Sequence, residues 1–134
     1  MDKKLQDKLY QKYPKIFQDR KKPIRESCMP WGLECGNGWY KILDILCGLL
    51  QWDTDKNKYP QVVASQVKEK YGGLRFYTNG ENEQQSGMIK FACALSEHTC
   101  EECGSMEDVQ QTEGWIATKC GQCMKEYKEN RGIK

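Results

Sequence analysis

The sequence contains a single histidine, His98, among its 134 residues, and this scarcity excludes several classes of enzyme. Zinc-finger nucleases with paired histidines, His-Glu-x-x-His zinc hydrolases and Ser-His-Asp hydrolases with a Gly-x-Ser-x-Gly turn would all lack required residues. A nucleophilic pair of Cys35 with His98 stays open, although no local pattern specifies it. We therefore predict a protein that is not an enzyme.

Long hydrophobic runs are also missing. The longest largely apolar stretch, residues 39–50, is too short to span a bilayer and contains Lys41 and Asp44. Residues 1–14 are charged and show no apolar segment of a signal peptide. We expect a cytoplasmic protein with no membrane partner. In that reducing compartment, cysteines bind metal or stay as buried thiols more often than they form disulfides.

Cysteine, by contrast, is abundant, and four of the eight cysteines form two Cys-x-x-Cys pairs. Sixteen residues separate the pair Cys100 and Cys103 from the pair Cys120 and Cys123, a spacing typical of a four-cysteine zinc site. Each pair lets one turn of backbone direct two thiolates at the same ion, and two such turns complete a tetrahedron. A redox role would need only one pair, and neither pair is expected to lie between a strand and a helix of thioredoxin type. The sequence therefore predicts one structural Zn²⁺ per chain.

The residues around the two pairs predict the form of the zinc finger. The segment between them should form a hairpin that turns near Glu113-Gly114, with Trp115 or Ile116 covering the metal. After Cys123, a helix-forming segment should stop at Gly132. A Cys-x-x-Cys turn (a zinc knuckle), followed by a hairpin and a final helix, resembles a treble-clef finger. A zinc ribbon would end in another strand. Both forms stay open.

The other four cysteines give weaker signals. Cys47 and Cys93 fall inside amphipathic helical patterns, where a thiol is a small core residue. Cys28 and Cys35 could form a second metal site with one of them, although neither belongs to a Cys-x-x-Cys pair. The sequence leaves this second site open.

Hydrophobic periodicity predicts three helices and one hairpin before the zinc finger. Apolar residues recur at three- and four-residue steps over residues 2–13, 39–50 and 83–96, and the apolar faces of the two central helices should pack into the core. Asn37 is placed to cap the second helix, and residues 51–60 are predicted to form a polar loop. Residues 62–80 alternate and carry Gly72-Gly73 at a two-residue turn. The predicted fold is α+β, a small helical and β-hairpin domain over residues 1–97 with the zinc finger of residues 98–134 packed on it.

Charge is unevenly distributed along the chain. Residues 1–25 carry nine Lys or Arg against three Asp, a net charge of +6. Residues 97–134 carry eight acids against five bases, a net charge of −3, and four thiolates around Zn²⁺ add about −2 more. A zinc finger this acidic should repel nucleic acid, so we expect its metal to have a structural role.

Two motifs are candidates for a binding surface. The loop "WGLECGNGW", residues 31–39, opens a helix whose first N–H groups favour an anion. The segment "KEKYGGLRFY", residues 68–77, places cations and aromatic rings on a hairpin. Two simpler interpretations stay open: the loop glycines only let Trp31 and Trp39 pack, and the hairpin cations form a solvated strand face. The predicted binding residues are Trp31, Asn37, Lys68, Lys70, Arg75 and Tyr77.

The "WGLECGNGWY" loop, the "QVKEKYGGLRFYTNG" hairpin and the paired cysteines together resemble a family of small uncharacterised proteins of bacteriophages and prophages. The resemblance covers most of residues 30–123, and the hairpin motif is its most specific part. It implies the cytosol of a bacterial host and carries no catalytic residues with it. We expect a non-catalytic accessory protein that binds a host protein and inhibits or redirects it, such as part of an anti-phage defence system. Alternative hypotheses are sequestration of a small nucleotide between the Trp31–Trp39 loop and Arg75, and nucleic-acid binding by the basic N-terminal helix.

Overall fold

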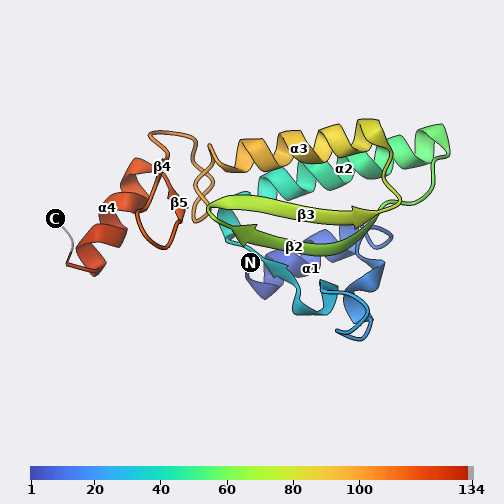
Figure 1. The fold of residues 1–134 in the computed structure, drawn as a ribbon, viewed down its shortest axis with the longest axis horizontal. Coiled ribbons are helices and arrows are strands. Elements are labelled where there is room, and N and C mark those ends of the chain that lie inside the picture. Colours follow the sequence, from blue (N-terminus) through green and yellow to red (C-terminus); the bar gives the residue numbers. More distant parts are fainter. Residues whose placement is uncertain (133–134) are drawn as a thin grey trace.

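The computed structural model describes residues 1–132, and Figure 1 shows the arrangement of its helices and strands. The α-helices are α1 (Lys3–Lys12), α2 (Tyr40–Asn57), α3 (Glu83–Ser96) and α4 (Gly121–Asn130). The strands are β1 (Leu33–Glu34), β2 (Val63–Lys70), β3 (Gly73–Asn79), β4 (Gln110–Gln111) and β5 (Thr118–Lys119). Short 3-10 turns precede α2 at η1 (Gln18–Lys21), η2 (Met29–Trp31) and η3 (Asn37–Trp39). The fold is α+β, as the sequence predicts.

A three-stranded sheet in the order β1-β2-β3 forms the centre of the N-terminal part of the chain. β1 runs parallel to β2, and β3 runs antiparallel to β2. α2 and α3 lie side by side along the sheet, and α1 lies below it in the view (Figure 1). One continuous apolar core joins these layers, and its fully buried side chains include Leu9, Phe17, Trp39, Leu43, Leu50, Val67 and Leu74.

α1 and α3 lie within a residue of the positions that the sequence predicts for them. Each begins at a capping side chain: Asp2 accepts a hydrogen bond from the Leu5 backbone N–H, and Asn82 forms a capping box with Gln85. A cap satisfies backbone N–H groups that the first helical turn leaves without partners. Local sequence therefore sets where these two helices start.

α2 is longer than the sequence predicts, because residues 51–57 continue the helix and do not form a loop. Two polar side chains of this segment, Asp53 and Thr54, are buried and accept hydrogen bonds from Gln85 Nε2 on α3. The polar residues of this segment are therefore explained by a contact between α2 and α3. α2 ends before Lys58, whose φ of 55° is left-handed. Within the described part of the chain, neither α2 nor any other helix is long and apolar enough to cross a bilayer.

The predicted N-cap role of Asn37 is wrong. The turn η3 precedes α2, and no side chain caps α2. The Asn37 side chain instead contacts the start of α1: its Oδ1 accepts from the Asp2 backbone N–H at 2.8 Å, and its Nδ2 donates to Asp2 Oδ2 at 3.0 Å. These two bonds connect the beginning of α1 to the beginning of α2.

The β2–β3 turn lies one residue earlier than predicted, at Tyr71 and Gly72 instead of Gly72-Gly73. Lys70 pairs with Gly73, so Gly73 already belongs to β3. Both turn residues have positive φ, 53° for Tyr71 and 82° for Gly72. This is the pattern of a type I′ turn, whose twist matches that of the flanking strands.

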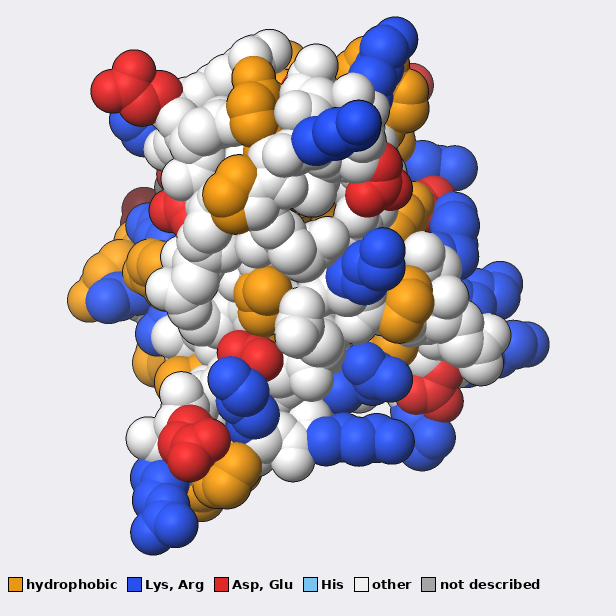
Figure 2. Space-filling view, turned by 90° about the vertical axis from the view of Figure 1, so that its right-hand side faces the viewer, with side chains coloured by type: hydrophobic (Ala, Val, Ile, Leu, Met, Phe, Trp, Pro, Cys, Tyr) orange, Lys and Arg blue, Asp and Glu red, His pale blue; other side chains and the backbone are white. Residues whose placement is uncertain are grey.

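Charge differs between the two ends of the elongated molecule. The cysteine pairs and α4 lie at one end, and Figure 2 shows the face at the other end. Lys and Arg side chains are the prevailing charged groups on that face (Figure 2). The acidic C-terminal segment lies at the end of the molecule opposite to this face (Figure 1).

Candidate metal centre and adjoining groove

The four predicted ligands, Cys100, Cys103, Cys120 and Cys123, come together in space. Their Sγ atoms all lie within 4.8 Å of one another, and the Sγ atoms of Cys103 and Cys120 are 3.6 Å apart. Four sulfurs at bonding distance from one tetrahedral Zn²⁺ lie about 3.8 Å apart, whereas a disulfide requires about 2.05 Å. None of the eight cysteines forms a disulfide. The cluster therefore has the geometry of a site for one metal ion.

Two different local structures position the cysteine pairs. We call residues 100–105 the first knuckle; Cys100 N donates to Ser105 O at 2.8 Å, and Gly104 N donates to Cys100 O at 2.9 Å. Gly104 has a φ of 83°, which lets the chain reverse tightly after Cys103. The second pair opens α4: Cys120 is the N-cap, and its Sγ accepts from the Cys123 backbone N–H. A helix N-terminus stabilises negative charge, which suits a thiolate.

The surroundings of the four sulfurs favour a bound cation. Burial raises the pKa of the Cys100 thiol, but hydrogen bonds from the backbone N–H groups of Cys120, Cys103 and Glu102 outweigh burial and hold that pKa at about 7. For Cys123, burial and contact with the other three thiols both raise the pKa. Four thiolates this close cannot all be charged unless a cation compensates them, and metal binding displaces their protons.

The order of elements distinguishes the two forms of finger that the sequence leaves open. After the first knuckle, β4 and β5 form an antiparallel hairpin, with Gln110 opposite Lys119, and the second pair leads directly into α4. A ribbon would continue into another strand, whereas α4 runs to Asn130 and Gly132 follows with a φ of 66°. The described residues therefore have the treble-clef order. The predicted finger of residues 98–134 includes residues 133–134, which lie outside the described part of the chain.

The prediction that Trp115 or Ile116 covers the metal is wrong. Trp115 is 86% exposed at the tip of the β4–β5 hairpin, and Ile116 lies against the β2–β3 turn at Gly72. The apolar residue that packs against the buried cysteines is Val109. The base of the hairpin is attached to the β2–β3 turn, where Thr118 Oγ1 donates to Gly72 O at 2.5 Å.

The glycines of the "WGLECGNGW" loop bring that loop into backbone contact with the first knuckle. Gly38 N donates to Glu101 O at 2.7 Å, and Gly36 N donates to Glu101 Oε2 at 2.8 Å. A Cβ on Gly38 would overlap the carbonyl oxygen of Cys100, and one on Gly36 would overlap that of Glu101. The buried indole of Trp39 adds a third link, because its Nε1 donates to Thr99 O at 2.9 Å. The loop is therefore a docking site for the metal-binding segment.

The predicted binding residues divide into two groups in space. Lys68 lies opposite Arg75 in the β2–β3 ladder, and Tyr77 lies two residues beyond Arg75, so these side chains share one face of the hairpin. Lys70 also belongs to that face, and its ammonium lies 5.6 Å from the Tyr71 ring. Trp31 precedes β1, on the opposite edge of β2, and Asn37 contacts α1. A binding role for these six residues stays a prediction.

The remaining cysteines form no second cluster. Among residues 1–132, Cys100, Cys103, Cys120 and Cys123 are the one group of three or more metal-ligating side chains within reach of a common ion. Burial raises the pKa of Cys35 to about 12 and also raises the pKa of Cys47 and of Cys93. A thiol that stays protonated is a poor nucleophile, so the environment of Cys35 opposes a catalytic pair with His98.

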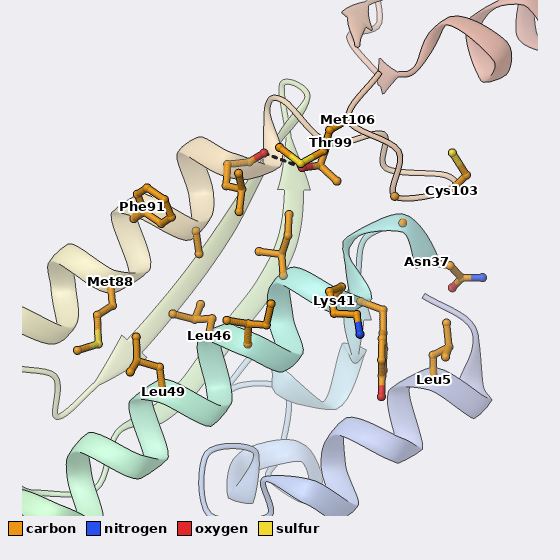
Figure 3. Close-up of a pocket in the computed structure, with 17 residues that line it drawn as sticks. Leu5, Asn37, Lys41, Leu46, Leu49, Met88, Phe91, Thr99, Cys103 and Met106 are labelled. Atoms are coloured by element: carbon orange, nitrogen blue, oxygen red, sulfur yellow. Dashed lines mark hydrogen bonds between the residues drawn. The ribbon is translucent and has the colours of Figure 1, made fainter. Parts of the chain in front are cut away.

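An apolar groove adjoins the first knuckle and was not anticipated from the sequence. It encloses about 800 Å³ between α2, α3, the start of α1 and the knuckle. In Figure 3, Leu46 and Leu49 of α2 face Met88 and Phe91 of α3, and Met106 and Cys103 lie toward the far end. Apart from Cys103, one of the four candidate metal ligands, the lining contains one charged residue, Lys41, and no carboxylate.

Several large apolar side chains of the groove are exposed to solvent. Phe91 is 72% exposed, Ile45 64% and Met106 60%. The expectation that the central helices bury their apolar faces in the core is therefore wrong for part of each helix. On α2, Ile45, Leu49 and Trp52 form a second apolar stripe beside the buried one, at spacings of four and three residues. This second apolar stripe is the feature of the sequence from which an exposed apolar surface on the helix could have been predicted.

Fold and site together define an α+β protein with a four-cysteine metal-binding finger at its C-terminal end. Comparisons with protein-family models, with curated proteins and with solved structures found no match.

Proposed function

We propose that the chain is a non-catalytic protein of bacteriophage type that binds a host protein, inhibiting or redirecting it, with one structural Zn²⁺ holding its C-terminal module. The apolar groove is the observation that carries this proposal. Contiguous exposed apolar surface is uncommon on monomeric proteins and marks sites of interaction. Phe91, Ile45 and Met106 contribute such a surface from three separate segments of the chain.

The four-cysteine site supports zinc in a structural role. Cysteine thiolates in a tetrahedral set are typical ligands of Zn²⁺, and four protein ligands leave no coordination position for water or substrate. A catalytic zinc site keeps one position open. In this chain the metal would instead fix the first knuckle, whose residues Cys103 and Gly104 form the end wall of the groove.

The phage context comes from the sequence motifs. The "WGLECGNGWY" loop and the "QVKEKYGGLRFYTNG" hairpin resemble those of small phage and prophage proteins. Small accessory proteins of this kind act on components of the host cell, anti-phage defence systems included, which makes a host protein the proposed partner. The link is one of association, and the groove supplies the physical basis for binding.

A small nucleotide is a second candidate ligand, favoured by the position of Lys68, Arg75 and Tyr77 on one face of the β2–β3 hairpin. Cations beside an aromatic ring can bind a phosphate and stack a base. This candidate uses a different surface from the groove. The two functions are therefore separable by substitution.

We expect the double substitution Ile45→Glu and Phe91→Glu to abolish binding of the host partner while the protein stays folded. Both side chains are largely exposed, so the change in unfolding free energy should be about 1 kcal/mol or less. The measurement is affinity purification from the bacterial host, with mass spectrometry of bound proteins and nucleotides, beside thermal unfolding of each variant.

Arg75→Ala and Tyr71→Glu are the matched controls, since both residues lie on the hairpin and neither lines the groove. The partner should remain bound to both control variants. If Arg75→Ala loses a bound nucleotide while the Ile45→Glu, Phe91→Glu variant still binds what the wild-type protein binds, the second candidate is favoured and the first is contradicted.

A further inference from the structure

The direction of the groove and the spacing of its charges indicate the shape of what it binds. α2 and α3 run in opposite directions side by side (Figure 1). The groove is lined by Ile45 and Leu49 of α2 and by Phe91 of α3. Along α2, the exposed stripe of Ile45, Leu49 and Trp52 is bracketed by Lys41 and Lys56. Fifteen helical steps separate the two lysines, a distance of about 22 Å, or roughly four turns of a partner helix.

Addition of a partner strand to the sheet is disfavoured. The outer edge of β3 already faces α3: the Leu74 backbone N–H donates to Ser96 Oγ at 2.8 Å, and the Phe76 backbone N–H donates to the Cys93 thiol. At the other edge, β1 contains only two residues. A partner that docks on apolar side chains between two helices fits the helix-in-groove mode of recognition instead.

The two lysines that bracket the exposed stripe, Lys41 and Lys56, favour acidic groups at its two ends. Each carboxylate of α2 has a partner within this chain: Asp44 accepts from Lys12 Nζ at 2.7 Å, Asp53 accepts from Gln85, and Asp55 accepts from Gln51 at 2.9 Å. No carboxylate in the described part of the chain forms an ion pair with Lys41 or Lys56. Lys56 lies with its ammonium 4.7 Å from the Trp52 ring, at the end of the apolar stripe.

A second copy of this chain is a poor occupant for the same reason. In a two-fold dimer with antiparallel α2 helices, Ile45 would face Trp52 of the other copy, and Lys41 would then face Lys56. In a parallel arrangement, each lysine would face itself. Either dimer brings like charges together at both ends of the contact, which is unfavourable.

We infer that the groove binds an amphipathic α-helix whose apolar face is flanked by acidic residues, one near Lys41 and one near Lys56. This inference rests on the proposed function and specifies the chemistry of its partner. Helical neighbours at three- and four-residue spacing on the partner would contact Ile45 and Leu49 on one side and Phe91 on the other. The acidic side chains would pair with the two lysines and set the position of the helix along the groove.

The test uses two designed helical peptides of about four turns, identical except for charge. Both carry leucines along one face; one has glutamates beside that face at its two ends, and the other has lysines there. Fluorescence anisotropy gives the dissociation constant of each peptide for the intact metal-loaded protein. We expect the acidic peptide to bind about tenfold more tightly than the basic one, as two partly exposed ion pairs would give.

Charge reversal on the protein should reverse the preference. With Lys41→Glu and Lys56→Glu together, the basic peptide should bind more tightly than the acidic one. The control is Lys90→Glu with Lys125→Glu, which changes the net charge equally at exposed positions outside the α2 stripe that Lys41 and Lys56 bracket. The control should keep the order of the wild-type protein. Sedimentation should show a monomer.

Three results would overturn the inference: equal binding of the two peptides, no binding of either, or a dimer that Ile45→Glu dissociates. If the Ile45→Glu, Phe91→Glu variant still loses its host partner in any of these cases, the proposed function stands and only the acidic helix is wrong. If that variant keeps its host partner, the proposed function itself is wrong, whatever the peptides do.

Discussion

Replacing Cys120 by serine should release the metal and unfold residues 98–132, while the core formed by residues 9–92 persists. Cys120 is nearly fully buried, caps α4 and supplies one of the four sulfurs. The buried apolar cluster of this segment consists of Cys100, Cys120 and Cys123 themselves, with Val109 packed against them. Without metal, the segment has almost no hydrophobic core of its own. Structural Zn²⁺ contributes roughly 10–16 kcal/mol of apparent binding free energy in small zinc modules, which is as large as the stability of a whole domain.

Elemental analysis measures the zinc content, and hydrogen–deuterium exchange followed by NMR measures the protection of backbone amides. We expect about one zinc per wild-type chain and none in the serine variant, with backbone protection lost over β4, β5 and α4 and retained in the α2–α3 layer. Cys28→Ser is the matched control, because Cys28 lies outside the cluster and should leave zinc content unchanged. Metal-free protein that keeps a protected α4, or a disulfide among the four cysteines, would contradict a structural zinc.

Loss of the metal should also weaken binding in the groove. Cys103, Gly104 and Met106 form its end wall, and all three belong to the segment that the metal orders. The α2 and α3 walls would remain, since their core contacts do not involve the cysteine cluster. The effect of a chelator on peptide binding is therefore expected to be partial, and it would show that the metal acts on recognition through structure.

Features set by neighbouring residues could be predicted from the sequence. The paired cysteines come together, α3 occupies residues 83–96, and the β2–β3 hairpin forms with an error of one residue in its turn. In each case the signal is local: a two-residue spacing, apolar residues at three- and four-residue steps, or glycine beside alternating apolar residues. Such signals do not depend on how the rest of the chain is arranged.

Features that depend on distant contacts could not be predicted. The polar segment after Gln51 is helical because Gln85, far along the chain, donates to Asp53 and Thr54. The sequence leaves open whether the glycines at 36 and 38 form an anion site or let Trp31 and Trp39 pack; in the structure they allow the backbone of Glu101 to approach. The groove depends on the side-by-side placement of α2, α3 and the first knuckle, and no single helical pattern reports that arrangement. Tertiary contacts override local preference at these positions.

The substitution Gly38→Ala should destabilise the protein by about 2–4 kcal/mol, because its methyl group would collide with backbone and not with a movable side chain. The ideal Cβ overlaps the carbonyl oxygen of Cys100 and approaches the carbonyl carbon of Glu101 to 2.6 Å. Relief of this overlap requires the "WGLECGNGW" loop to separate from the first knuckle. That movement breaks the 2.7 Å hydrogen bond from Gly38 N to Glu101 O and disturbs the Trp39 contact with Thr99.

Gly87→Ala is the matched control, since Gly87 lies in the middle of α3 and its Cβ would meet no atom within 4 Å. Alanine favours a helix interior over glycine, so this variant should be more stable than the wild type by about 0.5–1 kcal/mol. Urea unfolding of the metal-loaded proteins measures both changes, and unchanged m-values would show that the same structure unfolds. If Gly38→Ala is as stable as the wild type while Gly87→Ala shows its expected gain, the loop can yield to the methyl group, and the close contact between loop and knuckle is not what holds the metal-binding segment to the core.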